Sequence, residues 1–197
     1  MSASIAVGHG TVLRLIVRED GPALAEAYRR NRRRLAPWEP LRSARFFEAG
    51  GQTDAIADAL HGHRSGALLP LVLERGDELV GRVTLSNVVR GAFDSADLGY
   101  WVDGELEGRG VMTRAVGATL GLARDELRLH RVQAGTLLHN VGSQTVLERN
   151  GFERIGVARR YLRIAGEWQD HLLFQVLLED AATTPLLPPQ PSPMRLV

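Results

Sequence analysis

The sequence predicts a mixed α/β domain and not a doubly wound nucleotide-binding fold. Its strand-like and helix-like segments follow the order β-α-α-β-β-β-α-β-α-β-β. A length of 197 residues suits one domain, and a composition of 44% hydrophobic and 24% charged residues is ordinary for a globular protein. We therefore expect a single domain over residues 1–180. A tail over residues 181–197, which holds five of the nine prolines, should be extended or disordered.

Composition excludes several kinds of chemistry. The chain has no cysteine, which removes disulfides, thiolate metal sites and a cysteine nucleophile. All 24 basic residues are arginine, so a catalytic lysine, a Schiff base and a P-loop lysine are also excluded. His61 and His63 share a glycine spacer but have no further ligand cluster, and we expect no metal site. With a net charge of +1, no apolar run of membrane-spanning length and no signal-peptide pattern, a cytoplasmic protein without membrane contact is expected.

The N-terminal elements are expected to be one strand and two helices. Thr11–Arg18 reads as the strand, and Asp20 with Pro22 then opens the first helix as an N-cap followed by an early proline. Pro37–Pro40 ends that helix, and a second amphipathic helix covers Arg45–His61. The mostly apolar stripe of the first helix is Leu24, Tyr28, Asn31 and Leu35.

The remaining elements are separated by turn signals at Arg75-Gly76-Asp77 and Ala165-Gly166, and by a helix stop at Gly151. In the strand 96–102, alternation places Asp97, Gly99 and Trp101 on one face. The expected strands are Leu68–Glu74, Glu78–Val88, Ala96–Val102, Arg131–Leu138, Phe152–Ile164 and Glu167–Leu178, and the expected helices are Val111–Leu127 and Val141–Asn150.

The most informative segment joins the strand 96–102 to the helix at Val111. Amides at a helix N-terminus have no partners within the helix and suit a phosphate or pyrophosphate. Gly108 and Gly110 allow close approach of the main chain to an anion, and Arg109 would add a charged contact. The alternative is a glycine turn that only joins strand to helix. A dinucleotide-binding fingerprint fails, because Thr113 stands where the third glycine belongs.

Five motifs together resemble the GNAT acetyltransferases over roughly residues 11–179. The nearest branch is the one that acetylates the N-terminal alanine of ribosomal proteins, known as RimJ and RimL. The likeness extends to Arg34–Pro40, Arg159–Leu162 and Trp168–His171. The motifs are Leu98–Val102, Glu107–Thr113, His130–Val132, Asn140-x-x-Ser143 and Val146–Phe152. The resemblance implies the GNAT fold, a twisted and mostly antiparallel sheet of about seven strands with a splayed parallel pair and flanking helices.

The resemblance also implies acetyl-CoA as co-substrate. The loop would hold the CoA pyrophosphate, although Glu107 and Met112 depart from the family pattern. Asn140 would hydrogen-bond the pantetheine arm, or cap the helix that follows, or both. The expected cofactor-binding residues are Tyr100, Trp101, Val102, Glu107, Gly108, Arg109, Gly110, Val111, Met112, Thr113, Asn140 and Ser143.

The catalytic residues are less clear from the sequence. Ser143 matches the family serine near the thioester sulfur and would help the thiolate leave. Some relatives place a glutamate where this chain has Tyr161 or Leu162, so that carboxylate is not carried over. Asp97 is a candidate base acting through water, and a strand-edge charge is its alternative. The residues expected on the acceptor side are Trp38, Tyr161, Asp170 and His171.

The predicted function is transfer of an acetyl group to a primary amine by direct reaction in a ternary complex. Protein N-termini starting with alanine or serine are the expected acceptors, because an α-amine is partly neutral at physiological pH and needs little help from a base. A small-amine acetyltransferase and an inactive acyl-CoA sensor are alternatives. The arginine-rich helix Arg29–Arg34 suggests docking on a ribosome, or else a solvated face, and a homodimer is possible.

Overall fold

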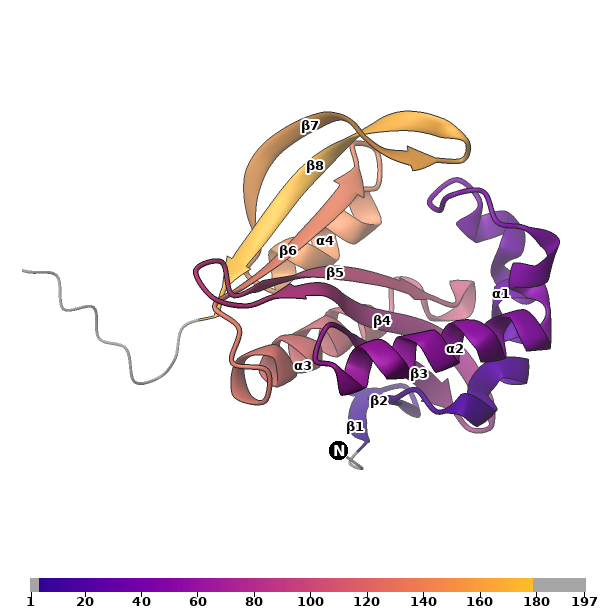
Figure 1. Cartoon of the computed structure of the whole chain (residues 1–197). Coiled ribbons are helices and arrows are strands. Elements are labelled where there is room, and N and C mark those ends of the chain that lie inside the picture. Colours follow the sequence, from indigo (N-terminus) through magenta and orange to yellow (C-terminus); the bar gives the residue numbers. More distant parts are fainter. Residues whose placement is uncertain (1–3, 179–197) are drawn as a thin grey trace, which may run out of the picture.

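The computed structural model describes residues 4–178, and the proline-rich tail lies outside that range. Eight strands form a single sheet in the order β1-β2-β3-β4-β5-β6-β8-β7 (Figure 1). The pairs are antiparallel except for β5 and β6, which run parallel. The strands are β1 (Ile5–Gly8), β2 (Thr11–Leu15), β3 (Leu69–Arg75), β4 (Glu78–Val89), β5 (Ser95–Val102), β6 (Arg131–Leu137), β7 (Glu153–Ile164) and β8 (Glu167–Leu177).

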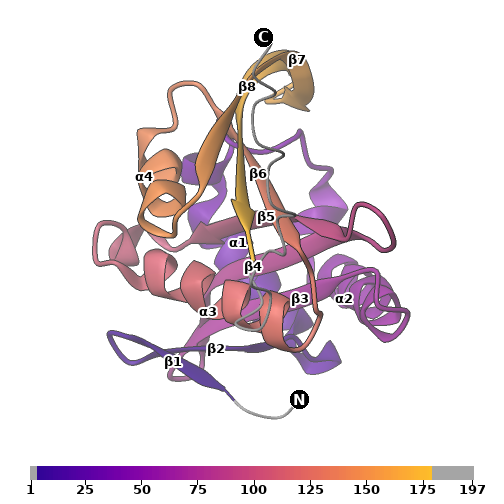
Figure 2. The ribbon, with the colours of Figure 1, turned by 90° about the vertical axis from the view of Figure 1, so that its left-hand side faces the viewer.

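Helices cover both faces of this sheet (Figures 1 and 2). One core joins α1 and α2 to the face of β5 that carries Trp101, and the other joins α3 to the face that carries Leu98 and Tyr100. The alternation predicted for β5 is therefore confirmed. The helices are α1 (Gly21–Leu35), α2 (Ala49–Arg64), α3 (Val111–Asp125) and α4 (Val141–Arg149).

The structure adds one strand to the predicted order. β1 pairs with β2 through a tight turn at Gly8–Gly10, and Val7 is buried in the core beneath α3. The short alternation Ile5-Ala6-Val7 was the available signal, but four residues carry little periodicity.

Some predicted boundaries were wrong for local reasons. The first strand ends at Leu15, because the carboxylate of Asp20 accepts the amide of Val17 at 2.8 Å and holds a 3-10 turn at Arg18–Asp20. That side chain therefore does not cap α1, although Pro22 does lie in its first turn. The second helix begins as a separate 3-10 turn, Ala44–Phe47, and α2 follows from Ala49. No helix in the described part of the chain is long and apolar enough to cross a membrane.

Candidate active site

The two parallel strands at the centre of the sheet separate part-way along their length. Pairing between β5 and β6 ends at Asp97 and Gln133. Two residues further on, at equivalent levels of the two strands, lie Gly99 and Gly135. A Cβ on Gly99 would meet nothing within 4 Å, so the strand leaves open space there. The splayed pair predicted from the sequence is therefore present, and its fork is lined by main chain as well as side chains.

The loop after β5 has the geometry expected of an anion site. Gly108 and Gly110 have φ values of 70° and 73°, in the left-handed region that favours glycine. Gly110 precedes the first turn of α3, whose leading amides have no acceptor within the helix. The backbone thus has the geometry for a pyrophosphate at the helix N-terminus, and binding of the anion there stays a prediction.

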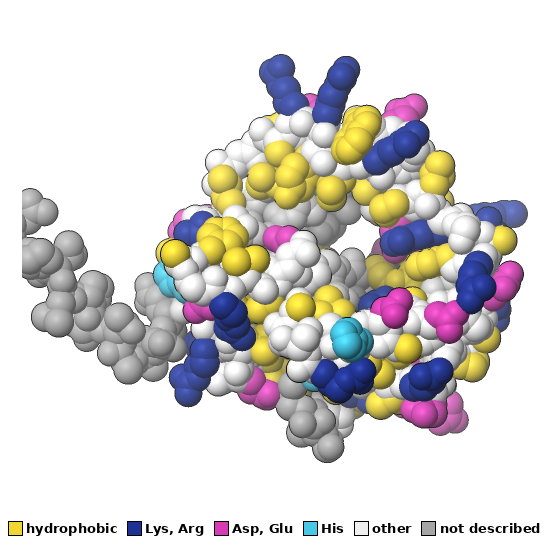
Figure 3. Space-filling model, in the orientation of Figure 1, with side chains coloured by type: hydrophobic (Ala, Val, Ile, Leu, Met, Phe, Trp, Pro, Cys, Tyr) yellow, Lys and Arg dark blue, Asp and Glu magenta, His cyan; other side chains and the backbone are white. Residues whose placement is uncertain are grey.

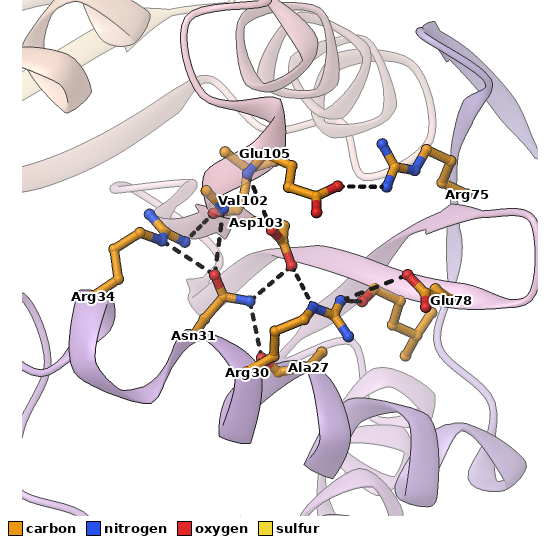
Figure 4. A network of polar contacts seen from close by, with 11 residues as sticks. Ala27, Arg30, Asn31, Arg34, Arg75, Glu78, Val102, Asp103 and Glu105 are labelled. Carbon is orange, nitrogen blue, oxygen red and sulfur yellow. Dashed lines mark hydrogen bonds and ion pairs between the residues drawn. The ribbon is translucent and has the colours of Figure 1, made fainter.

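A buried carboxylate fixes the start of this loop against α1 (Figure 4). Asp103 accepts hydrogen bonds from Arg30 Nε at 2.8 Å, from Asn31 Nδ2 at 2.9 Å and from the amide of Glu105 at 3.1 Å. Burial alone would raise the pKa of Asp103, but the hydrogen bonds from Asn31 and Arg30 outweigh it and lower that pKa. Asn31 also accepts the amide of Gly104, so α1 holds two consecutive residues at the start of the turn that leads into the loop.

Glu107, which departs from the family pattern, is neutralised by a residue far away in sequence. Its carboxylate forms an ion pair with Arg34 of α1, which also donates to the carbonyl of Val102. The charge that would repel a phosphate is therefore paired with a guanidinium at the same edge of the site.

Two cavities meet at the fork. The larger, about 660 Å³, runs along the loop and α4, and we call it the cofactor-side cavity. The smaller, about 230 Å³, lies between the middle of β5, β6 and the end of α1, and we call it the amine-side cavity. Both are lined by Leu35, Trp38, Tyr100, Trp101, Asn140 and Ser143.

Most of the predicted cofactor residues line the cofactor-side cavity. Arg109 and Val111 do not: Arg109 is exposed, and Val111 is buried in the core. The predicted residues that do line it are Tyr100, Trp101, Val102, Glu107, Gly108, Gly110, Met112, Thr113, Asn140 and Ser143.

Ser143 and Tyr100 form a hydrogen-bonded pair at the junction of the two cavities. Tyr100 Oη lies 2.8 Å from Ser143 Oγ and donates to the Ser143 carbonyl at 3.1 Å. Burial raises the pKa of Tyr100 to about 12, although the hydrogen bond with Ser143 lowers it, so the phenol keeps its proton at neutral pH. Asn140 Oδ1 accepts the Ser143 amide at 3.1 Å, which confirms Asn140 as the N-cap of α4.

The segment after α1 crosses over the amine-side cavity and contacts both neighbouring loops. The ring of Trp38 lies 5.2 Å from that of His139, in the loop between β6 and α4. The carbonyl of Glu39 accepts the amide of Ala165, in the β7–β8 turn, at 2.9 Å. Figure 3 shows the surface hollowed between this hairpin and the helices below it.

The residues predicted on the acceptor side separate into two groups. Trp38 and the buried His171 line the amine-side cavity. Tyr161 is 46% exposed, and its ring lies 5.6 Å from that of His171, outside the cavity lining. Asp170 accepts the amide of Arg160 at 2.9 Å and stabilises a bulge in β7. Asp97 accepts Asn87 Nδ2 at 2.9 Å and lines neither cavity.

Sequence reasoning missed Glu39. Its side chain is 19% exposed and lines the amine-side cavity. Its position beside Trp38, within a motif that carried the resemblance, was the available signal. Loop position gave no indication of where the side chain lies, so only the fold could place it.

Comparison with known proteins agrees with this geometry. Residues 11–153 match the family model described as an acetyltransferase (GNAT) domain. The chain belongs to the GNAT acetyltransferases. Members of this family are acetyltransferases, and GNAT proteins of similar structure bind CoA or acetyl-CoA as co-substrate.

Individual GNAT relatives are similar along most of the chain. The ribosomal protein uS5-alanine N-acetyltransferase of Escherichia coli is 35% identical over 176 residues, 88% of either chain. A ribosomal-protein-S5-alanine acetyltransferase from Vibrio fischeri superposes with a TM-score of 0.87 at 33% identity, covering 91% of this chain and 98% of its own. The structure of Mycobacterium smegmatis RimJ in complex with CoA-disulfide superposes with a TM-score of 0.82 at 31% identity. The match covers 88% of this chain and 84% of that one.

Most arginines of α1 in this GNAT chain have partners within the molecule. Arg30 and Arg34 pair with Asp103 and Glu107, and Arg29 donates to Glu26. The guanidinium of Arg32 lies 4.4 Å from the centre of the Phe47 ring. The helix therefore offers a smaller basic surface than its sequence suggests.

Proposed function

We propose that this chain transfers the acetyl group of acetyl-CoA to the α-amine of a protein N-terminus beginning with alanine or serine. The observation that carries the proposal is the junction of the two cavities at Tyr100 and Ser143. A thioester in one cavity and an amine in the other would meet there, which suits direct transfer in a ternary complex. The names of the E. coli and Vibrio fischeri relatives support a ribosomal protein as acceptor.

In this proposal the glycine loop and the N-terminus of α3 bind the pyrophosphate, and the side-chain NH2 group of Asn140 donates to the pantetheine arm. A main-chain amide of β5 stabilises the oxyanion that develops on the thioester carbonyl. Ser143 then donates its proton to the departing thiolate. Tyr100 positions the Ser143 hydroxyl, because its phenol lies 2.8 Å from Ser143 Oγ and donates to the Ser143 carbonyl at 3.1 Å.

The test is CoA release followed with a thiol reagent, to which a protein without cysteine contributes no background. Acceptors are peptides beginning with alanine, serine or methionine, an N-terminally blocked peptide with a lysine amine, a polyamine and an aminoglycoside. Release with only the alanine and serine peptides supports the proposal. Release with only small amines would overturn the acceptor. Binding of acetyl-CoA without release under any condition would favour an acyl-CoA sensor.

Docking on a ribosomal particle through the Arg29–Arg34 helix is a separate part of the proposal. Arg33 is the exposed residue to change, because Arg30 is engaged by Asp103 and its loss would disturb the fold. Arg33→Glu should weaken binding to ribosomal particles and reduce its salt dependence. Binding that ignores both salt and this change contradicts docking through this helix. A homodimer stays a prediction.

A further inference from the structure

The amine-side cavity contains a carboxylate that has no role in the structure described so far. Glu39 lies in the segment that crosses over the fork, and it faces a wall that includes Gly99, Gly135 and His171. The two glycines contribute no side chains, and the ionisable side chains that line this cavity are Glu39, His171 and Tyr100. Of these, Glu39 and His171 do not line the cofactor-side cavity.

The ion pair of Glu39 is weak. Arg42 Nε lies 3.5 Å from its carboxylate, beyond the usual length of a charge-assisted hydrogen bond. The Arg42 guanidinium also lies 4.5 Å from the centre of the Phe46 ring. The carboxylate therefore keeps acceptor capacity that a cationic ligand can use.

We propose that Glu39 is the general base of the reaction: its carboxylate receives the acceptor's ammonium group in the amine-side cavity and removes a proton before the nitrogen attacks the thioester. The inference rests on the proposed acetyl transfer to an amine. The ammonium loses one proton to Glu39, the nitrogen forms the C–N bond, and the C–S bond breaks. The nitrogen loses a second proton as the amide forms, and this proton passes through water to Ser143, which has given its own proton to the thiolate. Glu39 then returns its proton to water, so that both side chains regain their starting states.

The electrostatic surroundings of Glu39 suit this role. Burial raises its pKa, and the neighbouring charges of Arg42 and Arg82 reduce that shift without cancelling it. A carboxylate with a raised pKa is a better proton acceptor. The other ionisable groups nearby are Tyr28 of α1, whose hydroxyl accepts Trp101 Nε1 at 3.1 Å, and His171 of β8.

His171 is the rival base, and its hydrogen bond fixes which ring nitrogen can act. Nδ1 lies 3.0 Å from the carbonyl oxygen of Gln169. A carbonyl only accepts, so Nδ1 carries the proton and the lone pair of the neutral ring is on Nε2. His171 can therefore accept a proton from an amine through Nε2, and the experiment must compare the two residues.

The test compares Glu39→Gln with wild type, using the amine that wild type acetylates fastest. We expect kcat at pH 7 to fall at least 100-fold while the KM for acetyl-CoA and the Kd for CoA stay within twofold. The acidic limb of the wild-type pH profile, set by Glu39, should disappear. The kcat of the variant should instead rise as the amine itself loses its proton in solution. The difference in kcat between variant and wild type should therefore be smaller at pH 9 than at pH 7.

Glu48→Gln is the matched control, because Glu48 lies on the same stretch of chain with its side chain exposed. It should retain wild-type kinetics. If Glu39→Gln keeps more than a third of the wild-type kcat with an unchanged pH profile, the inference is overturned. If His171→Asn instead abolishes the acidic limb, the base is His171.

The two proposals fail in different ways. A preference for polyamines over peptides would overturn the N-terminal acceptor, and Glu39 would then be tested with the polyamine. If no amine is acetylated, wild type and Glu39→Gln are compared instead by their rates of acceptor-free acetyl-CoA hydrolysis, in which water is the nucleophile. An equal hydrolysis rate in wild type and Glu39→Gln would contradict the inference, and a 10-fold or greater loss would support it.

Discussion

The amide of Ala165 donates a 2.9 Å hydrogen bond to the carbonyl of Glu39, so the β7–β8 turn holds the segment that carries the cavity carboxylate. Gly166, the next residue of the turn, also lies close to this segment. Gly166 has a φ of 90°, and a Cβ at this position would lie 3.1 Å from Leu41 Cδ1. Glycine at position 166 therefore suits both the backbone conformation of the turn and the narrow space beside Leu41.

Gly166→Ala should raise the KM for the acceptor amine several-fold and leave the KM for acetyl-CoA unchanged. At a φ of 90° the new side chain adds a backbone strain of about 1–2 kcal/mol to the turn whose Ala165 amide holds the segment, and its methyl group crowds the Leu41 side chain. The control is Gly91→Ala, at a φ of 82° with open space around it. It should lose similar stability and keep the acceptor KM. Equal KM values for the acceptor amine in the Gly166→Ala and Gly91→Ala variants would contradict the coupling between the β7–β8 turn and the segment that carries Glu39.

The sheet and the anion loop were predictable because their signals are local. Gly108 and Gly110 indicate a loop before a helix in which the main chain can approach an anion. The alternation of Asp97, Gly99 and Trp101 predicts which side chains share a face of β5. The ion pair between Arg34 and Glu107 joins residues 73 positions apart, so no periodicity reveals it. Glu39 lies in an irregular segment whose direction depends on contacts with distant loops. β1 was too short to predict from alternation.

Gly108→Ala should raise the KM for acetyl-CoA about tenfold, which corresponds to ~1.4 kcal/mol. The new side chain must adopt a φ near 70° and would stand where the loop approaches the pyrophosphate. Gly76→Ala is the matched control, since Gly76 has a φ of 60° and no atom within 4 Å of its Cβ position. It lies in the β3–β4 turn and should leave that KM unchanged. Steady-state kinetics with varied acetyl-CoA decide between these results.

Arg34→Gln should raise the KM for acetyl-CoA about fivefold, because it leaves the charge of Glu107 unpaired beside the phosphate loop. Glu107→Gln alone should change that KM little. The double variant should bind acetyl-CoA more tightly than Arg34→Gln does, with a coupling energy of about 0.5–1 kcal/mol. Additive effects in this cycle would show that Arg34 acts independently of Glu107.

Asp103→Asn should destabilise the protein by about 2 kcal/mol at pH 7, since hydrogen bonds from Arg30 and Asn31 to a charged acceptor are lost. The pKa of Asp103 is lowered by folding, so its contribution is present above the unfolded pKa of about 3.9 and is lost as pH falls through the folded value. Thermal unfolding should therefore separate the two proteins at pH 7, and the difference should begin to shrink only below about pH 4 and vanish below the lowered pKa of the folded protein. A constant difference across this range would exclude the ionised carboxylate as the cause.

The segment over the amine-side cavity touches the β6–α4 loop through Trp38 and the β7–β8 turn through Glu39, so the hollow beneath it is bridged by protein. An acceptor chain that enters as a single extended strand fits beneath such a bridge more easily than one that enters as a loop of two neighbouring strands. If the proposed acceptor is correct, its first residues must be free and unfolded when they enter. Acetylation would then compete with the folding and assembly of its own target, and its timing would depend on how long that N-terminus stays accessible.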